Sequence, residues 1–464
     1  MTTTPLATGC HLWVPHNRWD LATDIVLRPR TDTVAVIVPY YEQPESLLRM
    51  YEALAAATID RHQIELIVID DGSAVPPPPP PPSFEIATRV VRQPNRGFRP
   101  GAARNLGAAT TTADILVFLD ADTLPEPETV ARLAAWPAVM PDALVVGRRG
   151  HVDLTGWTPE ATGRWLTASG PGPRRRSDPS WLQLGYDETD NLLVADDRSY
   201  RFVISAVMAC HRWLYDDIGG FDATRDEYGG EDWEFASRAF NNGAVLVHDP
   251  TAVAWHDEPD WADRDGSSGA KNLETMWLAR AITEPSTRGR GLRHAQPDTI
   301  VRIVLPAGTT IGQFVVTIDS LLTGLPDIGI HLPSDLPEPL WRNVQHDQRV
   351  HRSRPANSSL VRARTVIDVD QPLMWEPVAL RETVDAVRPN GPGTITIRCS
   401  GQQLASVSST RALGRVRRAA VQGIDPLVAM AHLFGREVRH PAEAGVHPLH
   451  GEVDLAGSLA GGPS

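Results

Sequence analysis

The sequence has little cysteine, which limits the kinds of site that it can form. Of its 464 residues only three are cysteines, Cys10, Cys210 and Cys399, and they are odd in number and far apart. Such a pattern indicates neither a disulfide framework nor a zinc site. We therefore expect a protein of the reducing cytoplasm.

The sequence also lacks long apolar runs. No uninterrupted apolar segment reaches the roughly 18 residues that a membrane-spanning helix needs. Residues 1–30 do not show the basic stretch followed by an apolar run that is typical of a signal peptide. We expect no integral membrane segment, and at most a peripheral visit to a membrane.

Positive charge is in deficit as well. The chain has 44 Lys and Arg against 57 Asp and Glu, for a formal net charge of -13. This balance argues against a protein held to nucleic acid by broad neutralisation of phosphates. It leaves room for a local basic pocket that binds a diphosphate.

The length and the ordinary share of hydrophobic residues, 42%, predict two globular domains.

The pattern that is present is that of an α/β fold. Short β-branched runs at residues 34–38 and 64–69 alternate with a segment of helical spacing at residues 46–57, and the alternation continues to a strand at 114–119. This order predicts a mostly parallel sheet flanked by helices. Ligands of such sheets lie at the carboxyl ends of the strands.

A weak internal repeat follows a polar stretch at residues 284–297, which we interpret as a domain boundary. Residues 301–306, 314–322 and 327–332 echo the first strand, the first helix and the second strand, and the echo reaches residues 365–370. No second Gly-Gly-Glu-Asp phrase follows them. We expect a degenerate copy in the second half rather than a second working site.

These observations give three expected parts of the chain. They are an N-terminal arm at residues 1–30, a catalytic domain at 31–290 and a smaller C-terminal α/β domain at 298–464.

A pair of acids, Asp120 and Asp122, directly follows the buried strand that ends at residue 119. One of these carboxylates can face the ribose of a nucleotide while the other reaches a divalent cation. Mg²⁺ and Mn²⁺ prefer such hard oxygen ligands and bridge to diphosphate oxygens. His256, after another apolar strand, can supply a further ligand. A lone histidine is more often structural, but the acidic motifs that accompany His256 in this sequence favour a cation site.

A second pair of acids, Glu231 and Asp232, follows Gly229 and Gly230 at the expected start of a helix. A carboxylate fixed there can take the proton of an attacking hydroxyl group. The alternative is that these acids only interact favourably with the helix dipole.

Basic and polar residues near the first strands suggest a nucleotide site. Arg99 and Arg104 lie where guanidinium groups and a helix start favour phosphate oxygens, although salt bridges at that helix are the equal alternative. Tyr41 can stack on a nucleobase, and Asp71 can accept a hydrogen bond from a pyrimidine N–H. Both can equally serve a turn.

Five motifs together resemble the family-2 glycosyltransferases of the GT-A fold, over roughly residues 33–280. They are Val-Pro-Tyr-Tyr-Glu at 38–42, Asp-Asp-Gly-Ser at 70–73, Gly-Ala-Ala-Arg-Asn at 101–105, Asp-Ala-Asp at 120–122 and Gly-Gly-Glu-Asp at 229–232. His-Asp-Glu-Pro at 256–259, followed by Gly-Ala-Lys-Asn at 269–272, resembles in particular the chondroitin-polymerase and β-1,4-galactosyltransferase group.

This resemblance implies an inverting transfer from a nucleoside-diphosphate sugar, with a UDP-sugar expected, to a carbohydrate or other hydroxyl acceptor. It implies Mn²⁺ or Mg²⁺ as cofactor, Asp122 and His256 as metal ligands, Asp232 as base and Glu231 as a ligand of sugar hydroxyls. The implied nucleotide-sugar site comprises Pro39, Tyr41, Glu42, Asp71, Arg99, Arg104, Asp120 and Gly230. The resemblance also implies a role in polysaccharide biosynthesis.

Three departures from the family pattern keep alternatives open, one of which is that the second domain lacks a complete set of motifs. Glu42 stands where the family often has Asn, and seven prolines at residues 76–82 interrupt the segment after Asp-Asp-Gly-Ser. The proline run and the degenerate second half suggest an inactive carbohydrate-binding or scaffold protein as one alternative. A nucleotidyltransferase is another, but it leaves the Gly-Gly-Glu-Asp phrase without a task.

Overall fold

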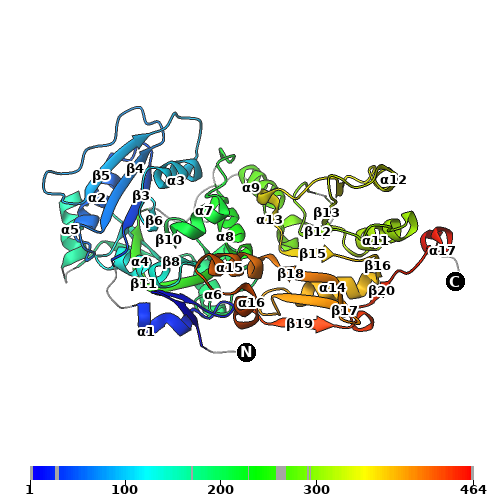
Figure 1. Ribbon diagram of the computed structural model, residues 1–464. Helices are drawn as coiled ribbons and strands as arrows, with labels where there is room; N and C mark the ends of the chain where they lie inside the picture. The colour runs from blue at the N-terminus through cyan, green and yellow to red at the C-terminus, as the bar shows by residue number, and fades with distance from the viewer. Residues whose placement is uncertain are drawn as a thin grey trace. The chain divides into compact units, whose positions relative to one another are not determined.

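The protein consists of two compact units in a computed structural model that describes residues 4–26, 31–168, 171–227, 229–257, 268–289, 292 and 294–460. Among these residues, the first unit comprises 4–240 and 244–278, and the second comprises 279–460 together with Asn241–Gly243. Each unit is built on its own sheet (Figure 1). The division falls between Leu278 and Ala279, just before the polar stretch in which a boundary was expected.

The first unit contains a nine-stranded mixed sheet in the order β5-β4-β3-β6-β10-β8-β11-β7, with β9 paired to β8. The four strands β5, β4, β3 and β6 are parallel, β10 is antiparallel to both of its neighbours, and β11 is parallel to β8. The bounds are β3 Val34–Tyr40, β4 Ile64–Asp70, β5 Ala87–Arg92, β6 Ile115–Leu119, β7 Thr123–Pro125, β8 Ala143–Asp153, β9 Arg174–Arg176, β10 Val207–His211 and β11 Val245–His256.

Helices and a short N-terminal hairpin complete the first unit. The helices α3 and α4 pack on the sheet, which is why β3, β4 and β6 are almost wholly buried and read as continuous apolar runs. The bounds are β1 Leu6–Thr8, β2 His11–Trp13, η1 Trp19–Ala22, α1 Thr23–Val26, α2 Pro44–Ala55, α3 Pro100–Ala109, α4 Thr129–Val139, α5 Pro159–Thr167, α6 Ser180–Glu188, η2 Ser199–Phe202, α7 Arg212–Ile218, α8 Glu231–Asn241 and α9 Ser268–Ala281.

The predicted α/β class and the order of its first elements are confirmed. One difference concerns the first strand, which was expected at residues 34–38 but continues through Pro39 to the end of β3. Pairing of β3 with β6 stops at Ile37, so the missing amide hydrogen of Pro39 costs no bond to that strand. The strand therefore continues beside β4 as far as Tyr40.

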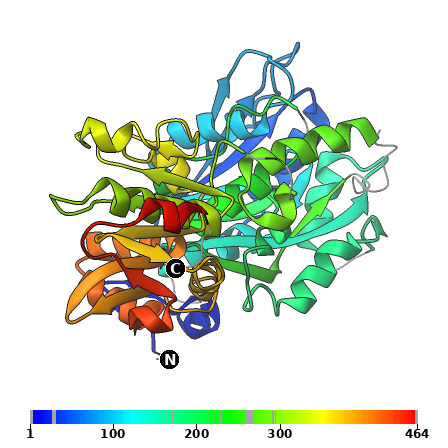
Figure 2. The same cartoon turned by 90° about the vertical axis from the view of Figure 1, so that its right-hand side faces the viewer.

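The second unit, which ends in the orange and red part of the chain in Figure 2, contains a seven-stranded sheet in the order β14-β13-β12-β15-β18-β17-β19 and a separate pair, β16-β20. The predicted strands and helix that echo the first half are all present. The bounds are α10 Pro285–Arg288, β12 Thr299–Ile303, α11 Ile311–Gly324, β13 Ile328–His331, α12 Glu338–Trp341, β14 Val350–His351, α13 Asn357–Leu360, β15 Thr365–Val369, β16 Leu373–Trp375, α14 Pro377–Ala386, β17 Thr394–Cys399, β18 Gln402–Ser409, α15 Thr410–Val421, α16 Pro426–Leu433, β19 Arg436–Arg439, η4 Pro441–Glu443, β20 Val446–Pro448 and α17 Leu455–Ala460.

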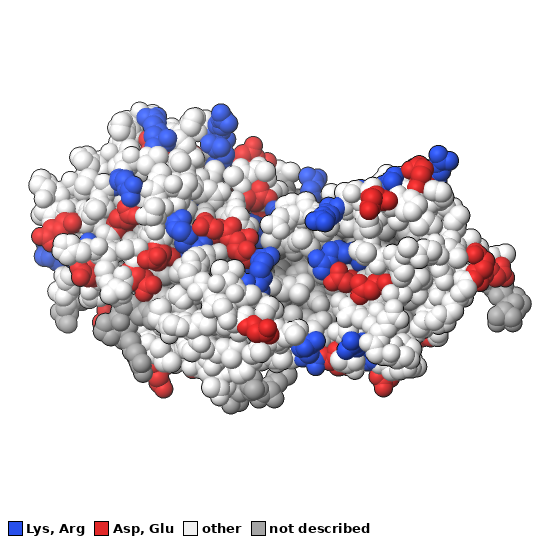
Figure 3. Space-filling view, viewed as in Figure 1, with Lys and Arg blue, Asp and Glu red and all other residues white. Residues whose placement is uncertain are grey.

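The surface carries charges of both signs. On the face shown in Figure 3, Lys and Arg side chains are interspersed with Asp and Glu side chains. Within the part of the chain that the structure describes, no helix combines the length and the apolar character that crossing a membrane requires.

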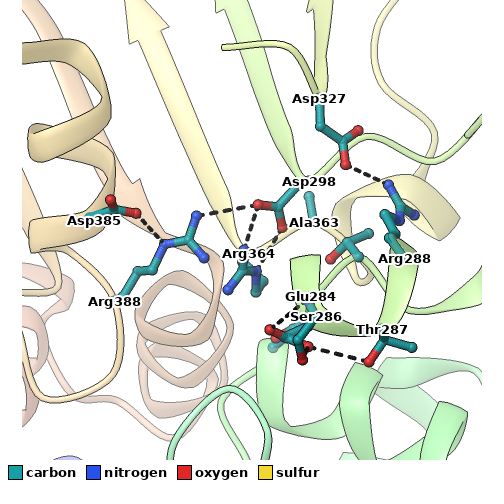
Figure 4. A network of polar contacts seen from close by, with 12 residues as sticks. Glu284, Ser286, Thr287, Arg288, Asp298, Asp327, Ala363, Arg364, Asp385 and Arg388 are labelled. Atoms are coloured by element: carbon teal, nitrogen blue, oxygen red, sulfur yellow. Dashed lines mark hydrogen bonds and ion pairs between the residues drawn. The ribbon is translucent and has the colours of Figure 1, made fainter. Parts of the chain in front are cut away.

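A buried network of ion pairs joins two strands of the second unit (Figure 4). Asp298, just before β12, accepts two hydrogen bonds of 2.7 Å from Arg364, just before β15, and a third of 3.3 Å from Arg388. Burial raises the pKa of Asp298, but the two guanidinium groups outweigh it and hold the pKa below its ordinary value. The carboxylate thus stays charged and connects neighbouring strands.

We predict that Asp298→Asn destabilises the second unit by about 3–5 kcal/mol, since it removes the buried negative charge that pairs with Arg364 and Arg388. The lowered pKa means that the stabilisation by Asp298 is complete above its unfolded value of about 3.9 and is lost as the pH falls through the folded value. Urea denaturation at several pH values, with hydrogen exchange of the β12 and β15 amides, measures both effects.

Asp385→Asn is the matched control, because Asp385 also pairs with Arg388 at 3.1 Å but its side chain is 70% exposed. Such exposed pairs contribute about 0–1 kcal/mol. Equal destabilisation by the two substitutions would contradict the structural role assigned to Asp298.

Candidate active site

The register of two strands brings Asp122 and His256 together. The short strand β7 pairs antiparallel with the end of β11, so that Thr123 lies opposite His256. Asp122 directly precedes this pair, and its Oδ1 lies 3.3 Å from His256 Nδ1. Two residues far apart in the sequence are thus fixed by backbone pairing.

The environment of the pair keeps Asp122 charged. Thr123 Oγ1 lies 3.3 Å from His256 Nδ1 and donates a weak hydrogen bond of 3.4 Å to Asp122 Oδ1. The ring of His151 contacts that of His256 edge-on, with centroids 5.2 Å apart. Burial by itself raises the pKa of Asp122. The hydrogen bond with His256 and the charge of His256 outweigh this effect, so that the pKa of Asp122 lies below its ordinary value.

The pair fits a divalent cation. Their side chains are 16% and 11% exposed, so one edge of each is accessible. A cation about 2.1 Å from each donor atom is compatible with a donor separation of this size. No cluster of three or more His, Cys, Asp or Glu side chains in the described ranges can hold a metal ion. The remaining ligands would therefore come from water or from a bound diphosphate.

Asp257 anchors the strand end that carries His256. Its backbone N–H donates to the carbonyl of Asp122 at 3.2 Å, and its side chain accepts hydrogen bonds from Leu154 N at 2.7 Å and Arg49 Nη1 at 3.1 Å. The sequence singled out Asp257 only as part of a motif, and the buried Arg49 on α2 carried no signal. The last two residues of that motif, 258 and 259, lie outside the described residues.

The turn before α8 requires glycine. Gly229 and Gly230 both have φ of 89°, a conformation that residues with a side chain rarely adopt. A Cβ atom on Gly230 would also come within 3.1 Å of Leu278. The predicted turn and helix start are therefore present, and α8 begins at Glu231.

Among the acids of this candidate site, Asp232 has the most strongly shifted pKa. Burial and the neighbouring charge of Glu231 raise the pKa of Asp232 to about 7, against opposing effects of Arg104, the Trp233 amide and Arg149. The amide of Trp233 donates to Asp232 Oδ1 at 2.8 Å. A carboxylate with a pKa close to neutral can accept and release a proton under ordinary conditions.

Arg104 connects the two acid pairs. It is buried, at 1% exposure, and donates to Asp120 Oδ1 at 2.7 Å and to Glu231 Oε1 at 3.2 Å. The acids after β6 and those at the start of α8 are therefore held in one network. Two roles were expected for Arg104, and the structure contains the salt bridges that make up one of them. The other role, a contact with the nucleotide sugar, stays a prediction.

The residues expected around a nucleobase lie at the ends of β3 and β4. Asp71 is buried and accepts hydrogen bonds from Gln93 Nε2 at 2.6 Å and from the Arg99 amide at 3.3 Å. Burial raises its pKa above the ordinary value. Tyr41 is 47% exposed, and its hydroxyl accepts from Asn95 at 3.3 Å. The exposure of the Tyr41 ring is compatible with stacking on a base.

Glu42 has a turn function in the described structure. It adopts a φ of 49°, its carboxylate accepts from the Ala74 amide at 3.1 Å, and its own amide donates to Ser73 Oγ at 3.1 Å. The Arg99 guanidinium donates to the carbonyl of Pro94 at 3.0 Å. These contacts fix the loops after β3 and β5, and the predicted donor contacts of Glu42 and Arg99 remain predictions.

Comparison with known families places these motifs in a defined context. Residues 35–199 match the model of glycosyl transferase family 2, and residues 195–250 match that of the N-terminal domain of galactosyltransferase. The first match contains the acid pair after β6, and the second contains Glu231 and Asp232.

Characterised proteins with similar sequences agree with this context. A hyaluronan synthase of Pasteurella multocida is 28% identical over 53% of this chain and 27% of its own length. A chondroitin synthase of Escherichia coli is 26% identical over 54% of this chain and 38% of its own length. A pre-mycofactocin glycosyltransferase of Mycobacterium tuberculosis is 28% identical over 64% of this chain and 57% of its own length.

The matched region thus spans between 27% and 57% of the length of these relatives. Among solved structures, a mannosyltransferase of Pyrobaculum calidifontis in complex with GDP-Man and Mn²⁺ has a TM-score of 0.35 at 17% identity, over 57% of this chain and 68% of that chain. A likeness of that size is loose, so the assignment rests on the sequence matches. Taken with the motifs and their arrangement, these matches show that the first unit carries a glycosyl transferase family 2 domain.

Proposed function

We propose that this chain is a cation-dependent inverting glycosyltransferase that moves a sugar from a nucleoside-diphosphate sugar, with UDP as the expected nucleotide, to a hydroxyl group of an acceptor. The observation that carries the proposal is the network of charged residues in the first unit. It comprises Asp122 and His256 at 3.3 Å and the bridge by Arg104 from Asp120 to Glu231, next to Asp232.

The donor would lie along the carboxyl ends of β3, β4 and β6. Tyr41, Pro39, Glu42 and Asp71 lie near the nucleobase end in this arrangement, and Asp120 near the ribose. Asp122 and His256 would hold Mn²⁺ or Mg²⁺, which neutralises charge on a leaving diphosphate. Arg99 and Gly230 complete the set of residues assigned to the donor.

Asp232 would act on the acceptor. Its carboxylate takes the proton of the acceptor hydroxyl group, whose oxygen forms a bond to the anomeric carbon. The bond from that carbon to the diphosphate oxygen breaks, and the nucleoside diphosphate leaves with the electron pair. Attack opposite the leaving group inverts the anomeric configuration. Glu231, fixed by Arg104, would bind hydroxyl groups of the donor or acceptor.

The proposal also covers the class of acceptor and the cellular location of the reaction. The names of two relatives, a hyaluronan synthase and a chondroitin synthase, support a carbohydrate acceptor and a role in polysaccharide biosynthesis. A cytoplasmic site of action fits the supply of nucleotide sugars. Nucleic acid is not an expected partner, given the net charge of -13.

We predict that Asp232→Asn lowers the rate of nucleoside diphosphate release by about 10²–10⁴-fold, because the amide cannot accept the proton. Release from a panel of nucleotide sugars with Mn²⁺ is the measurement. Activity equal to that of the unsubstituted protein would remove Asp232 from the role of base.

Thermal unfolding provides the control for that substitution. A carboxyl group with a raised folded pKa destabilises the fold increasingly as the pH rises from about 3.9 to about 7. Asp232→Asn removes this effect, so its melting temperature at pH 8 should equal or exceed that of the unsubstituted protein. A large decrease would mean that lost activity reflects unfolding.

The same pKa predicts the pH dependence of transfer. Below pH about 7 the base is increasingly protonated, so kcat/KM should fall about tenfold per pH unit. Arg149→Met should move this limb to higher pH, since the positive charge of Arg149 favours ionised Asp232. A flat profile from pH 5.5 to 8, with chemistry rate-limiting, would contradict the assignment.

A further inference from the structure

The two units share one strand plan. In each sheet four parallel strands are followed by an antiparallel strand, a strand antiparallel to it and a final strand parallel to that one. The matching orders are β5-β4-β3-β6-β10-β8-β11 and β14-β13-β12-β15-β18-β17-β19. The chain also passes through the matching strands in the same sequence order.

Hydrogen bonds extend this match to single residues. Asp120 directly follows β6, and its amide donates to the carbonyl of Ala206 at 3.3 Å. Asp370 directly follows β15, and its amide donates to the carbonyl of Leu404 at 2.9 Å. Ala206, just before β10, and Leu404, within β18, occupy the same register position, because each directly precedes the partner of the last residue of β6 or β15. Asp370 is therefore the counterpart of Asp120.

The next positions are matched by a second pair of bonds. The amide of Asp257 donates to the carbonyl of Asp122 at 3.2 Å, and the amide of Leu449 donates to the carbonyl of Pro372 at 3.0 Å. Pro372 thus corresponds to Asp122.

The strand pairs that follow have the same register. Thr123, the first residue of β7, lies opposite His256, and Leu373, the first residue of β16, lies opposite Pro448. Pro448 thus corresponds to His256.

Both cation ligands are therefore replaced by proline in the second unit. A proline side chain has no oxygen or nitrogen atom that could bind a metal. The remaining acid, Asp370, accepts a hydrogen bond from Gln403 at 2.9 Å, whereas its counterpart Asp120 pairs with the buried Arg104. The backbone of the site is retained and its ligands are lost.

The segments that carry the other chemistry are shortened as well. Between α7 and α8 the first unit has residues 219–230 with the two glycines, whereas only residues 422–425 join α15 to α16. Between β8 and β10 it has residues 154–206, whereas β17 and β18 are joined by Ser400 and Gly401 alone. The turn that precedes the proposed base and the long segment before β10 therefore have no counterpart of similar length in the second unit.

From these matches we infer that the second unit is a repeat of the first that has lost its cation site, so that within the described residues the chain has a single cation-dependent donor site. This inference rests on the proposed function of the first unit. A chain with one donor site adds sugar from that site only and does not alternate between two donor sites of its own.

The test is the number of Mn²⁺ ions bound per full-length chain, measured by calorimetry and by electron paramagnetic resonance with UDP present. We expect a ratio of one, and no binding in Asp122→Ala. Asp370→Ala, the counterpart of a change at Asp120, is expected to leave the ratio and the transfer rate unchanged. Two ions per chain, or an ion that persists in Asp122→Ala and is lost in Asp370→Ala, would overturn the inference.

The proposed function and this inference fail in different ways. No Mn²⁺ bound to the unsubstituted chain would overturn the proposed cation site of the first unit, yet would agree with the absence of a site in the second.

A double substitution, Pro372→Asp with Pro448→His, tests the residue match directly. It is expected to add a second, weaker Mn²⁺ site. A ratio that stays at one in a folded double variant would show that the two prolines are not the cause of the loss.

Discussion

The antiparallel pairing of β7 with the end of β11 is the constraint on which the site depends. It places Thr123 opposite His256 and therefore sets the position of Asp122 to within a few ångströms of the imidazole. A shift of one residue in this register would turn alternate side chains to the other face of the strand. Asp257, with its bonds to Leu154 and Arg49, holds the register at the point where the strand ends.

The second organising interaction is electrostatic. Arg104 carries one positive charge between Asp120 and Glu231, and its own side chain is buried, so the attraction is least weakened by solvent toward Glu231, the less exposed of the two carboxylates. Its charge also opposes the rise in the pKa of Asp232. One side chain thus links the edge of the sheet to the helix α8 and moderates the protonation of the acid beside it.

Much of the fold could be predicted from the sequence because local patterns determine it. Buried parallel strands need continuous apolar residues, so residues 64–69 were recognisable as the strand β4. The pair Gly229-Gly230 predicts a turn by residue type alone. Side-chain partners were less accessible. Arg49 and Arg149 lie far in the sequence from Asp257 and Asp232, and only the folded chain brings each pair together. The contacts of Arg104 likewise depend on a helix and a strand end that meet in the tertiary structure.

The different connections between matching strands have a consequence for how such proteins can diversify. Ser400 and Gly401 show that two residues suffice to join this pair of strands, whereas the first unit uses residues 154–206 for the same junction. The longer segment carries Trp181, whose ring lies 6.3 Å from that of Trp233, next to Asp232. The matching strands of the second unit pair without such a segment. The segment can therefore vary in length and composition while the pairing of the strands stays the same. Exchange of this one segment can therefore change the surroundings of Trp233 and Asp232 without a change in the order of the strands.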